Sequence, residues 1–352
     1  MQISVAMATY NGQRFIRDQL DSIAHQTRPP DQLVVSDDGS SDDTVPIVRA
    51  FADRAPFEVV ILRNENRLGS SGNFFRAIEK CSGDLITPCD QDDVWRPTKL
   101  ARTEIAFQAS PRVTLVSHAV RVVDDHLRVL PSRWGRIRLT RRLRPGSMAP
   151  FSYSYSGFTL AFRSIFVRKL DVSRRPRAYA RADAPLEHDV WLNLVCRALG
   201  ETMLLSDTLA LYRRHASNVT RDGAGTSPHH LVRHAFRLQT EVDAYRDRAA
   251  LAREYAAYLD TLRPLAHQLG DASTEGLKQA VTAHTRFAKA MERRAAAYTQ
   301  RRTGRRAIHL LRHAAHGDYS TRTHGGLGAL SLARDFTIGL SRAAHDSPPV
   351  QE

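Results

Sequence analysis

The chain has 352 residues, of which 42% are hydrophobic and 25% charged, and its formal net charge is +14. This composition is typical of a folded globular protein and excludes disorder over most of the chain. The three cysteines, Cys81, Cys89 and Cys196, form no CxxC pair, which favours reduced thiols over a disulfide framework or a zinc site. The basic charge predicts an anionic partner without distinguishing nucleic acid, lipid headgroups and a phosphorylated substrate.

The first 110 residues alternate between short apolar runs and helical patterns. Strands are expected at 3–8, 32–36, 57–62 and 84–87, and helices at 13–25, 43–53 and 71–81. This alternation predicts an α/β fold with a mainly parallel sheet and helices on both faces. Ser41 or Asp42 is expected to cap the second helix. Ser70 or Ser71 is expected to cap the third, and a further strand is expected at 113–123.

The later part of the chain changes character twice. Residues 128–181 are loop-rich and basic, with six arginines between positions 132 and 146. A helix is expected at 187–200, followed by the strand TMLLSD and the segment 209–220. Beyond a glycine-rich break, long helical patterns rich in Ala, Leu and Arg follow. We therefore predict a catalytic domain over 1–225, with a basic insert at about 128–181, and an α-helical domain over 226–352.

Polar loops follow each of the first four predicted strands. They read ATYNG, SDDGSSD, NENRLGSSGN and CDQDD. Ligands of parallel sheets bind at the carboxyl ends of the strands, so these loops predict one site at one edge of the sheet. The chain has neither GxGxxG nor GxxxxGK[ST] after a strand, which argues against a nicotinamide, flavin or P-loop site.

The last of these loops concentrates negative charge in a basic chain. Three carboxylates within four positions repel one another unless a positive group lies against them. Mg²⁺ and Mn²⁺ are typically held by one or two carboxylates together with substrate phosphates and water. Asp90 could therefore bind a ribose while Asp92 binds the metal, although aspartates are also common in solvated turns. Asp37 and Asp38 could accept from the N3–H of a pyrimidine, and Tyr10 could stack on its face.

The series MATYNG, SDDGSSDDT, NRLGSSGNF and CDQDDVW resembles, in that order, the inverting family 2 glycosyltransferases of the GT-A fold. The likeness covers about the first 110 residues. It resumes at EHDVW and YRRHASNVT, which are similar to later motifs of bacterial members in cell-surface polysaccharide assembly, particularly rhamnosyltransferase-like ones. The arginine-rich insert and most of the C-terminal third lie outside the resemblance.

The resemblance implies roles for individual residues. The expected donor-nucleotide residues are Thr9, Tyr10, Asn11, Asp37, Asp38, Asn66, Asn73 and Asp90. Asp92, with Asp90, is expected to hold Mn²⁺ or Mg²⁺, and Asp93 is a possible substitute. Asp189 matches the general base. Arg213, Arg214 or His215 is expected on the donor diphosphate, and which arginine points inward is open. Trp95, Glu187 and His188 are expected near the acceptor or behind the catalytic residues.

The implied activity is a metal-dependent inverting transfer from dTDP-rhamnose or a UDP-sugar to a hydroxyl of a glycan or a lipid-diphosphate-linked acceptor. No run approaches 18 apolar residues, so a cytoplasmic protein is expected. The arginines of 133–144, with Trp134, would suit anionic lipid headgroups at the inner face of the membrane.

Two other functions compete with this interpretation. A nucleic-acid-binding protein would suit the basic charge, but no zinc-finger or RNA-recognition pattern is present, and no nucleic-acid partner is expected. A nucleotidyltransferase would also use carboxylate-bound metal, but ATYNG stands where its glycine-rich first loop would be.

Overall fold

The structure is a computed structural model that describes residues 1–151, 155–178, 184–216, 218, 242–300, 302–320, 326–329, 331–333 and 335–336. The chain forms two compact units. Unit 1 comprises 1–144, 153–175 and 186–222, and unit 2 comprises 145–152, 176–185 and 223–352. The boundary predicted near residue 225 lies outside the described residues. Two short segments of the basic insert, 145–152 and 176–185, group with the helical unit rather than with the predicted catalytic domain.

Unit 1 is built on one mixed sheet. Its strands are β1 (Ile3–Thr9), β2 (Gln32–Asp37), β3 (Glu58–Arg63), β4 (Leu85–Asp90), β5 (Val94–Trp95), β6 (Val113–Val123), β7 (Arg141–Leu143), β8 (Leu160–Arg163) and β9 (Glu201–Arg213). In the described part of the chain they follow the order β3-β2-β1-β4-β8-β6-β9-β5, with β7 paired to β9. The α/β class is confirmed. The sheet is less parallel than predicted, because β5, β7 and β8 run antiparallel to their neighbours.

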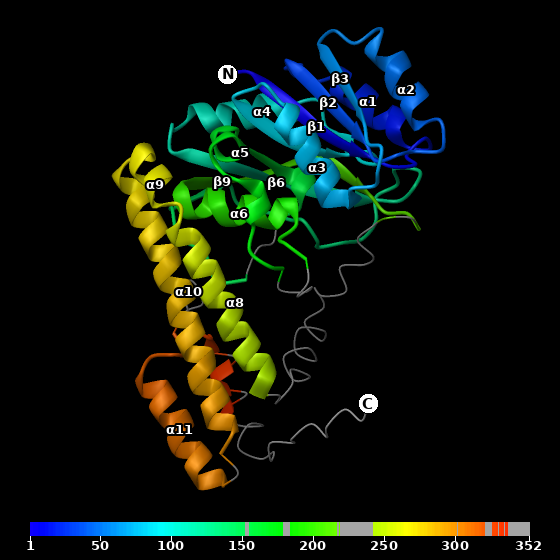
Figure 1. Ribbon diagram of the computed structural model, residues 1–352. Coiled ribbons are helices and arrows are strands. Elements are labelled where there is room, and N and C mark those ends of the chain that lie inside the picture. Colours follow the sequence, from blue (N-terminus) through cyan, green and yellow to red (C-terminus); the bar gives the residue numbers. More distant parts are fainter. Residues whose placement is uncertain are drawn as a thin grey trace. The chain divides into compact units, whose positions relative to one another are not determined.

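Helices cover both faces of this sheet. They are α1 (Ile16–Ala24), α2 (Thr44–Ala52), α3 (Gly69–Lys80), α4 (Lys99–Gln108), α5 (Ile165–Lys169) and α6 (His188–Leu199). Figure 1 shows β6 between α4 on one face and α6 on the other, and α3 beside α6. On α1 the buried Ile16, Leu20 and Ile23 recur at helical spacing and join the core with Val5 and Met7 of β1.

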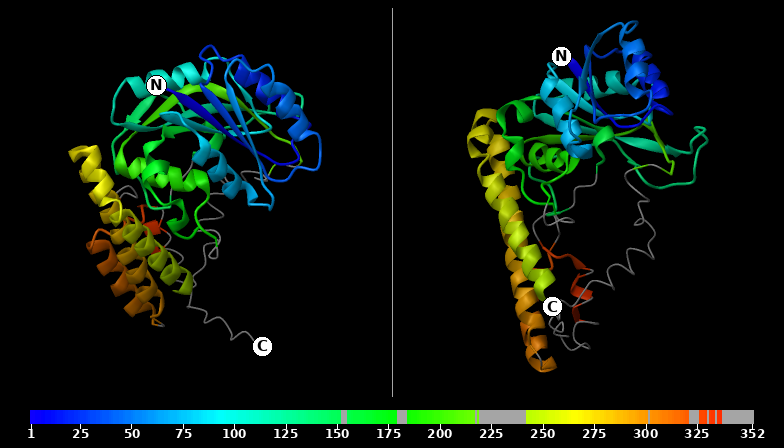
Figure 2. Two further views of the ribbon diagram at one scale, coloured as in Figure 1. Left: turned by 45° about the horizontal axis from the view of Figure 1, so that its top comes forward. Right: turned by 45° about the vertical axis from the view of Figure 1, so that its right-hand side comes forward.

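Unit 2 is helical, as predicted. Its helices are α8 (Val242–Asp260), α9 (Arg263–Leu269), α10 (Asp271–Tyr298) and α11 (Thr303–Ala315). Helices α8 and α10 lie side by side in all three views of Figures 1 and 2. Many of the buried residues on both are alanines, which let two helix backbones approach closely.

Two sequence-level expectations can be compared with the structure directly. Cys81, Cys89 and Cys196 are buried and form no disulfide. Over the residues described, no helix is both long and apolar enough to cross a membrane.

Acidification is expected to destabilise unit 2 through His284 of α10. Burial lowers the pKa of this fully buried imidazole from 6.5 to about 4. As the pH falls from 6.5 to 4, the unfolded chain binds a proton that the folded chain does not bind. The free energy of unfolding therefore decreases over this interval, by about 3 kcal/mol in full.

Urea titrations at several pH values measure this effect. His284→Asn keeps an amide donor for the Ala280 carbonyl, which His284 Nδ1 contacts at 2.8 Å, and does not titrate. Its stability should depend less on pH between 6.5 and 4 than that of the wild type. His316→Asn is the matched control, since His316 makes the same contact with the Arg312 carbonyl on the exposed surface. If the free energy of unfolding depends on pH equally in His284→Asn and in the wild type, the prediction is wrong.

Candidate functional site

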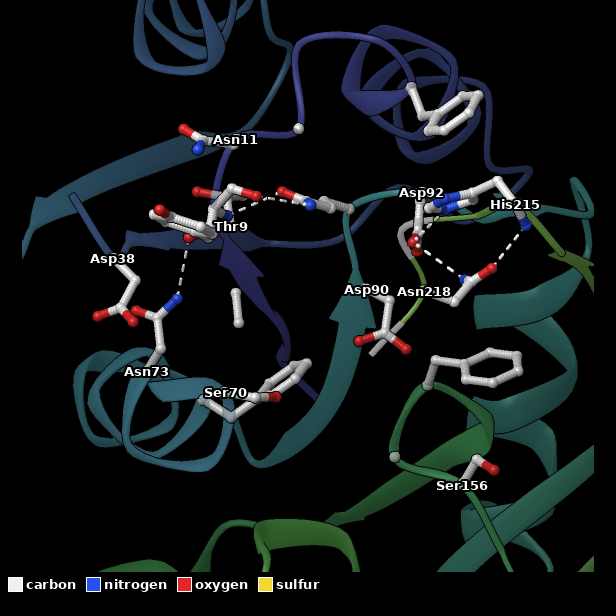
Figure 3. A pocket seen from close by; sticks show the side chains of 18 of the residues that line it. Thr9, Asn11, Asp38, Ser70, Asn73, Asp90, Asp92, Ser156, His215 and Asn218 are labelled. Carbon is white, nitrogen blue, oxygen red and sulfur yellow. Dashed lines mark hydrogen bonds and ion pairs between the residues drawn. The ribbon is translucent and has the colours of Figure 1, made fainter. Parts of the chain in front are cut away.

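A cavity of about 710 Å³ lies in unit 1 where β1, β4 and β9 end, a size typical of small-ligand sites. Figure 3 shows side chains from these strand ends, from α3 and from the segment before β8 directed into it. The sequence-predicted residues in its lining are Thr9, Tyr10, Asn11, Asp38, Asn73, Asp90, Asp92, His188, Asp189 and His215. Those outside the lining are Asp37, Asn66, Asp93, Trp95, Glu187, Arg213 and Arg214.

The first aspartate after β2 holds a turn. Asp37 is 1% exposed and accepts hydrogen bonds from the Ser40 amide at 2.9 Å and the Thr9 hydroxyl at 3.0 Å. Both of its oxygens are therefore used inside the protein, and the structure gives Asp37 no access to a nucleotide.

The second aspartate fixes the start of α3. Asp38 accepts from the backbone N–H of Leu68 at 2.7 Å and of Gly69 at 3.0 Å. Gly69 has a φ of +73°, in the left-handed region that glycine adopts without strain. The predicted cap by Ser70 or Ser71 is absent, because a carboxylate from the neighbouring strand already satisfies these free N–H groups. Asp38 also lines the cavity, so one carboxylate joins the helix start to the site.

Asparagines link the same loops. Asn64 donates to Asp38 at 2.8 Å and to Asn73 at 3.0 Å, and Asn73 donates to the Thr9 carbonyl at 3.1 Å. Asn66, the predicted nucleotide contact, is exposed and lies outside the lining. The asparagine that organises this loop is therefore Asn64, two positions earlier.

A flat stacked pair forms one end of the cavity. The Arg67 guanidinium lies 3.8 Å from the centroid of the Tyr10 ring, and both residues line the cavity. Such pairs contribute about 0.5–1 kcal/mol at exposed sites, so another planar group can displace the guanidinium. The stacking of a nucleotide base on Tyr10 stays a prediction, and the contact with Arg67 was not foreseen.

The middle residue of the Asp-Gln-Asp turn joins two loops. Gln91 accepts from the Tyr10 amide at 2.9 Å and donates to the Tyr10 carbonyl at 3.0 Å. The side chain passes over Gly12, where an added Cβ would lie 2.2 Å from Gln91 Oε1. This pair of hydrogen bonds ties the end of β4 to the end of β1, and it leaves the side chains on either side of Gln91 facing the cavity.

The Asp90 carboxylate faces the cavity without a hydrogen-bonding partner in the described part of the chain. Burial, then the negative charges of Asp92 and Asp189, raise the pKa of Asp90 to about 7, while Lys99 opposes the shift. Asp189 comes from α6, about a hundred positions later in the sequence. Asp90 and Asp189 line the same cavity, so each negative charge disfavours the other.

Asp92 is held by the segment after β9. His215 Nε2 lies 2.8 Å from Asp92 Oδ2, and Asn218 Nδ2 lies 3.5 Å from the same oxygen. The Asn218 side chain in turn accepts from the His215 backbone amide at 2.6 Å, and the His215 ring packs on Phe15. His215 thus lines the cavity and orients Asp92, the carboxylate that was predicted to hold a metal; its predicted contact with the donor diphosphate stays a prediction.

Asp93 points the other way. It is 0% exposed and accepts from the Arg213 amide at 3.0 Å, and its second oxygen has no hydrogen-bonding partner among the residues that the structure describes. Burial, with the charges of Asp92 and Asp90, holds the pKa of Asp93 well above its usual range. Asp93 is therefore buried and lies outside the lining, so it is not placed to replace Asp92 as a metal ligand.

Arg213 is buried in the protein rather than directed at a ligand. It is 2% exposed, and its guanidinium donates to the Asp92 carbonyl, the Asp125 carbonyl and the Asp18 carboxylate at 2.7–2.9 Å. All three nitrogens are occupied, and Arg214 lies outside the lining. The structure therefore does not support the diphosphate contact predicted for either arginine.

The start of α6 carries the predicted base. The backbone amide of His188 donates to the Ser71 hydroxyl at 2.8 Å, and the His188 ring stacks on Phe74 with 4.0 Å between centroids. Asp189 Oδ1 accepts from the Val190 amide at 2.7 Å, while Oδ2 accepts no hydrogen bond among the described residues. Ser71, expected to cap its own helix, instead anchors the helix that presents Asp189.

Trp95 belongs to the core. It is 2% exposed, and the Lys99 ammonium lies 3.6 Å from its ring centroid. Burial lowers the pKa of Lys99 to about 7, and its Nζ donates to the Phe158 carbonyl at 2.7 Å. The acceptor contact predicted for Trp95 is thus not available, and Glu187 also lies outside the lining.

Several lining residues were not predicted. They include Arg14, Arg67, Gln91, Trp134, Tyr212 and Asn218. Gln91 and Asn218 stand inside quoted motifs, and their amide side chains were a usable signal. Trp134 had no such signal, because it lies in the basic insert.

The residues present fit a divalent cation that is shared with a ligand. No group of three or more His, Cys, Asp and Glu side chains forms a complete metal site within the described ranges. Asp90 and Asp92 nevertheless provide two carboxylates in one cavity, and Asp90 lacks a positive partner at hydrogen-bonding distance. Mg²⁺ and Mn²⁺ suit such a pair, since substrate phosphates and water complete their octahedron.

Comparison with known proteins gives a consistent result. Residues 4–169 match the family model described as Glycosyl transferase family 2. An uncharacterized protein of Mycobacterium tuberculosis is 26% identical over 297 residues, 81% of each chain. The dTDP-rhamnosyl transferase RfbG of Shigella flexneri is 39% identical over 98 residues, 27% of this chain and 34% of RfbG. The fold resembles that of S. aureus TarS in complex with UDP-GlcNAc, with a TM-score of 0.52 and 15% identity over 96% of this chain and 92% of that one.

Gly12→Ala and Gln91→Ala are expected to damage the same contact. Alanine at position 12 displaces the Gln91 side chain, and alanine at position 91 removes it, so each change breaks both hydrogen bonds to Tyr10. Each should reduce the free energy of unfolding in urea by about 1–3 kcal/mol. In the double variant the second change should add almost nothing. If Gly12→Ala reduces the free energy of unfolding as much in the Gln91→Ala background as in the wild type, then Gly12 is not required to make room for the Gln91 side chain.

Proposed function

We propose that the protein is a metal-dependent inverting transferase, a proposal supported by the match of residues 4–169 to the family model described as Glycosyl transferase family 2. Its donor is a nucleotide-diphosphate sugar, and its acceptor is a hydroxyl of a glycan or of a lipid-diphosphate-linked sugar. The observation that supports this most directly is the meeting of Asp90 and Asp92, from the end of β4, with Asp189 from α6 in one cavity.

The nucleotide end of the site is formed by the loops after β1 and β2. Tyr10 offers a ring face for the nucleobase once Arg67 moves aside. Asp38 lines the same part of the cavity. The 39% identity with RfbG favours a dTDP-linked deoxyhexose such as rhamnose, with a UDP-hexose as the second possibility.

Asp90 and Asp92 would hold the divalent cation, which when bound offsets the negative charge of the donor diphosphate. His215 keeps Asp92 in place through its 2.8 Å contact. The arginines in the lining are Arg14 and Arg67, and they take the place of the buried Arg213 as positive groups near the diphosphate.

Asp189 is proposed as the general base. In an inverting transfer the acceptor oxygen forms a bond to the anomeric carbon as the bond to the diphosphate oxygen breaks, and the acceptor hydroxyl loses its proton. The free Oδ2 of Asp189 can take that proton, while Oδ1 is anchored by the Val190 amide. Help of this kind typically contributes about 10²–10⁴-fold to the rate.

Nucleotide diphosphates should stabilise the protein only together with the metal. We expect dTDP or UDP with Mn²⁺ to raise the melting temperature, since a ligand at a hundredfold excess over its Kd contributes about 2.7 kcal/mol. The same measurement with GDP and CDP shows which nucleobase the site prefers. Asp92→Asn should lose the Mn²⁺-dependent increase, whereas Asp43→Asn, at an exposed position, should keep it. A full Mn²⁺-dependent increase in Asp92→Asn would contradict the assigned metal ligand.

Asp189→Asn should separate binding from chemistry. The variant is expected to fold and to bind the nucleotide diphosphate as the wild type does, because Asn can still accept from the Val190 amide. Its rate of sugar transfer should fall about 10²–10⁴-fold, since the amide cannot take a proton. The anomeric configuration of the product, read by NMR, tests inversion in the wild type. Wild-type transfer rates in Asp189→Asn would exclude this residue as the base.

A further inference from the structure

Three aromatic side chains form a continuous surface inside the cavity, which we call the aromatic wall: Trp134, Phe158 and Tyr212. The rings of Trp134 and Tyr212 lie 4.7 Å apart, and Phe158 stacks on Tyr212 at 5.4 Å with 14° between planes. All three line the cavity. Phe158 is 2% exposed, while Trp134 and Tyr212 are half-buried, so these two present accessible ring surface.

The wall is held in place by its backbone. The Trp134 amide donates to the Ser132 hydroxyl at 3.1 Å, and the carbonyl of the next residue, Gly135, accepts from the Val120 amide of β6 at 3.0 Å. Gly135 has a φ of +68°, and an added Cβ would lie 2.3 Å from Val120. The insert is therefore fixed against the sheet at the point where Trp134 enters the cavity.

Polar groups without partners accompany the wall. The Ser156 hydroxyl makes no hydrogen bond in the described part of the chain, and neither does the Tyr212 hydroxyl; both residues line the cavity. Burial and the charges of Asp93, Asp90 and Asp92 raise the pKa of Tyr212 to about 12, so its phenol is protonated and lies near the carboxylates. Figure 3 shows Asp90 between Ser156 and the Asp38–Asn73 region.

We propose that the aromatic wall is the subsite for a pyranose ring of the acceptor, with Trp134 as the stacking surface. A pyranose has a face of C–H groups that packs on an aromatic ring and a rim of hydroxyls that needs polar partners, and the wall with Ser156, Tyr212 and Asp189 offers both. This inference rests on the proposed transfer and adds to it the residues that would bind the sugar ring of the acceptor.

The position of the wall assigns it to the acceptor rather than to the donor. Tyr10 and Asp38 follow β1 and β2, whereas the wall rests on β6 and β9, on the other side of β4 in the strand order. The β4 carboxylates lie between the two regions. A sugar on the wall therefore approaches the reacting centre from the side away from the nucleotide, where Asp189 can reach its hydroxyl.

Tryptophan fluorescence tests the subsite without requiring catalysis. Of the three tryptophans, Trp95 is 2% exposed and Trp191 is 0% exposed, so Trp134 is the one that acrylamide can reach. The full chain would be saturated with dTDP or UDP and Mn²⁺ and titrated with the methyl glycosides of rhamnose, glucose, mannose and N-acetylglucosamine. At least one glycoside should protect the fluorescence from acrylamide, and Trp134→Phe should remove the quenchable component.

Matched variants separate stacking from charge. Because these variants lack the fluorescent reporter, their affinities are measured by isothermal titration calorimetry. Trp134→Ala should weaken the affinity for the protecting glycoside roughly tenfold, and Trp134→Phe should weaken it less, because a smaller ring face remains. Both should keep the affinity for the nucleotide. Arg136→Ala, two positions away in the same basic insert, should bind the glycoside as the wild type does.

The outcomes distinguish this inference from the proposed function. Absence of nucleotide binding would contradict the donor site itself. Intact nucleotide binding with no protection by any of the four glycosides would overturn the acceptor subsite alone. Protection by anionic phospholipid vesicles in place of glycosides would also overturn it, and would assign Trp134 to a membrane surface. Protection by the free nucleotide sugar but by no glycoside would place the donor sugar on the wall and overturn the acceptor assignment.

Discussion

The site depends on how one short turn separates three carboxylates. Asp90, Asp92 and Asp93 lie within four positions, and their mutual repulsion would destabilise the turn if all three were charged and close together. Asp93 is buried, accepts from the Arg213 amide and has a pKa raised well above its usual range, while Asp92 is held by His215. Asp90 is left facing the cavity with a pKa raised to about 7. Each carboxylate has its own environment, so a single strand end can provide both structural support and two ligands for a cation.

This separation needs partners from distant parts of the chain. Gln91 keeps the turn in position by bonding the backbone of Tyr10, so the β1 and β4 loops act as one surface. Arg213 performs a similar task from β9, since its guanidinium donates to the Asp92 carbonyl and so fixes the backbone of the turn that carries Asp90 and Asp92. An arginine in a motif near a diphosphate was expected to bind the ligand. In this chain Arg213 instead supports the carboxylates that are proposed to hold the cation.

The α/β class and most strand positions followed from the sequence because buried strands and amphipathic helices have local patterns. The polar loops were also predictable, since they recur after each strand. The hydrogen-bonding partner of each polar side chain was not predictable from the sequence. Asp37 and Asp38 are adjacent and alike in sequence, yet one closes a turn and the other caps α3. Ser71 looked like the cap of its own helix, but it accepts from the His188 amide, 117 positions away. Such pairings are set by tertiary packing, which no local pattern reports.

The two proposed halves of the cavity, one for the donor and one for the acceptor, differ in how strictly the bound group limits the choice of residues. Holding a diphosphate and a cation requires carboxylates at a fixed strand end, and that requirement leaves a motif in the sequence. Holding a sugar ring requires only an aromatic face and a few hydroxyl or carboxylate partners, which many combinations of residues can supply. Trp134 therefore stands among arginines in a segment that resembles a basic surface, while its ring packs on Tyr212 beside the carboxylates. The proposed donor half of the cavity is visible in the sequence, whereas the proposed acceptor half becomes visible only once β6 and β9 are folded against the turn that carries Asp90 and Asp92.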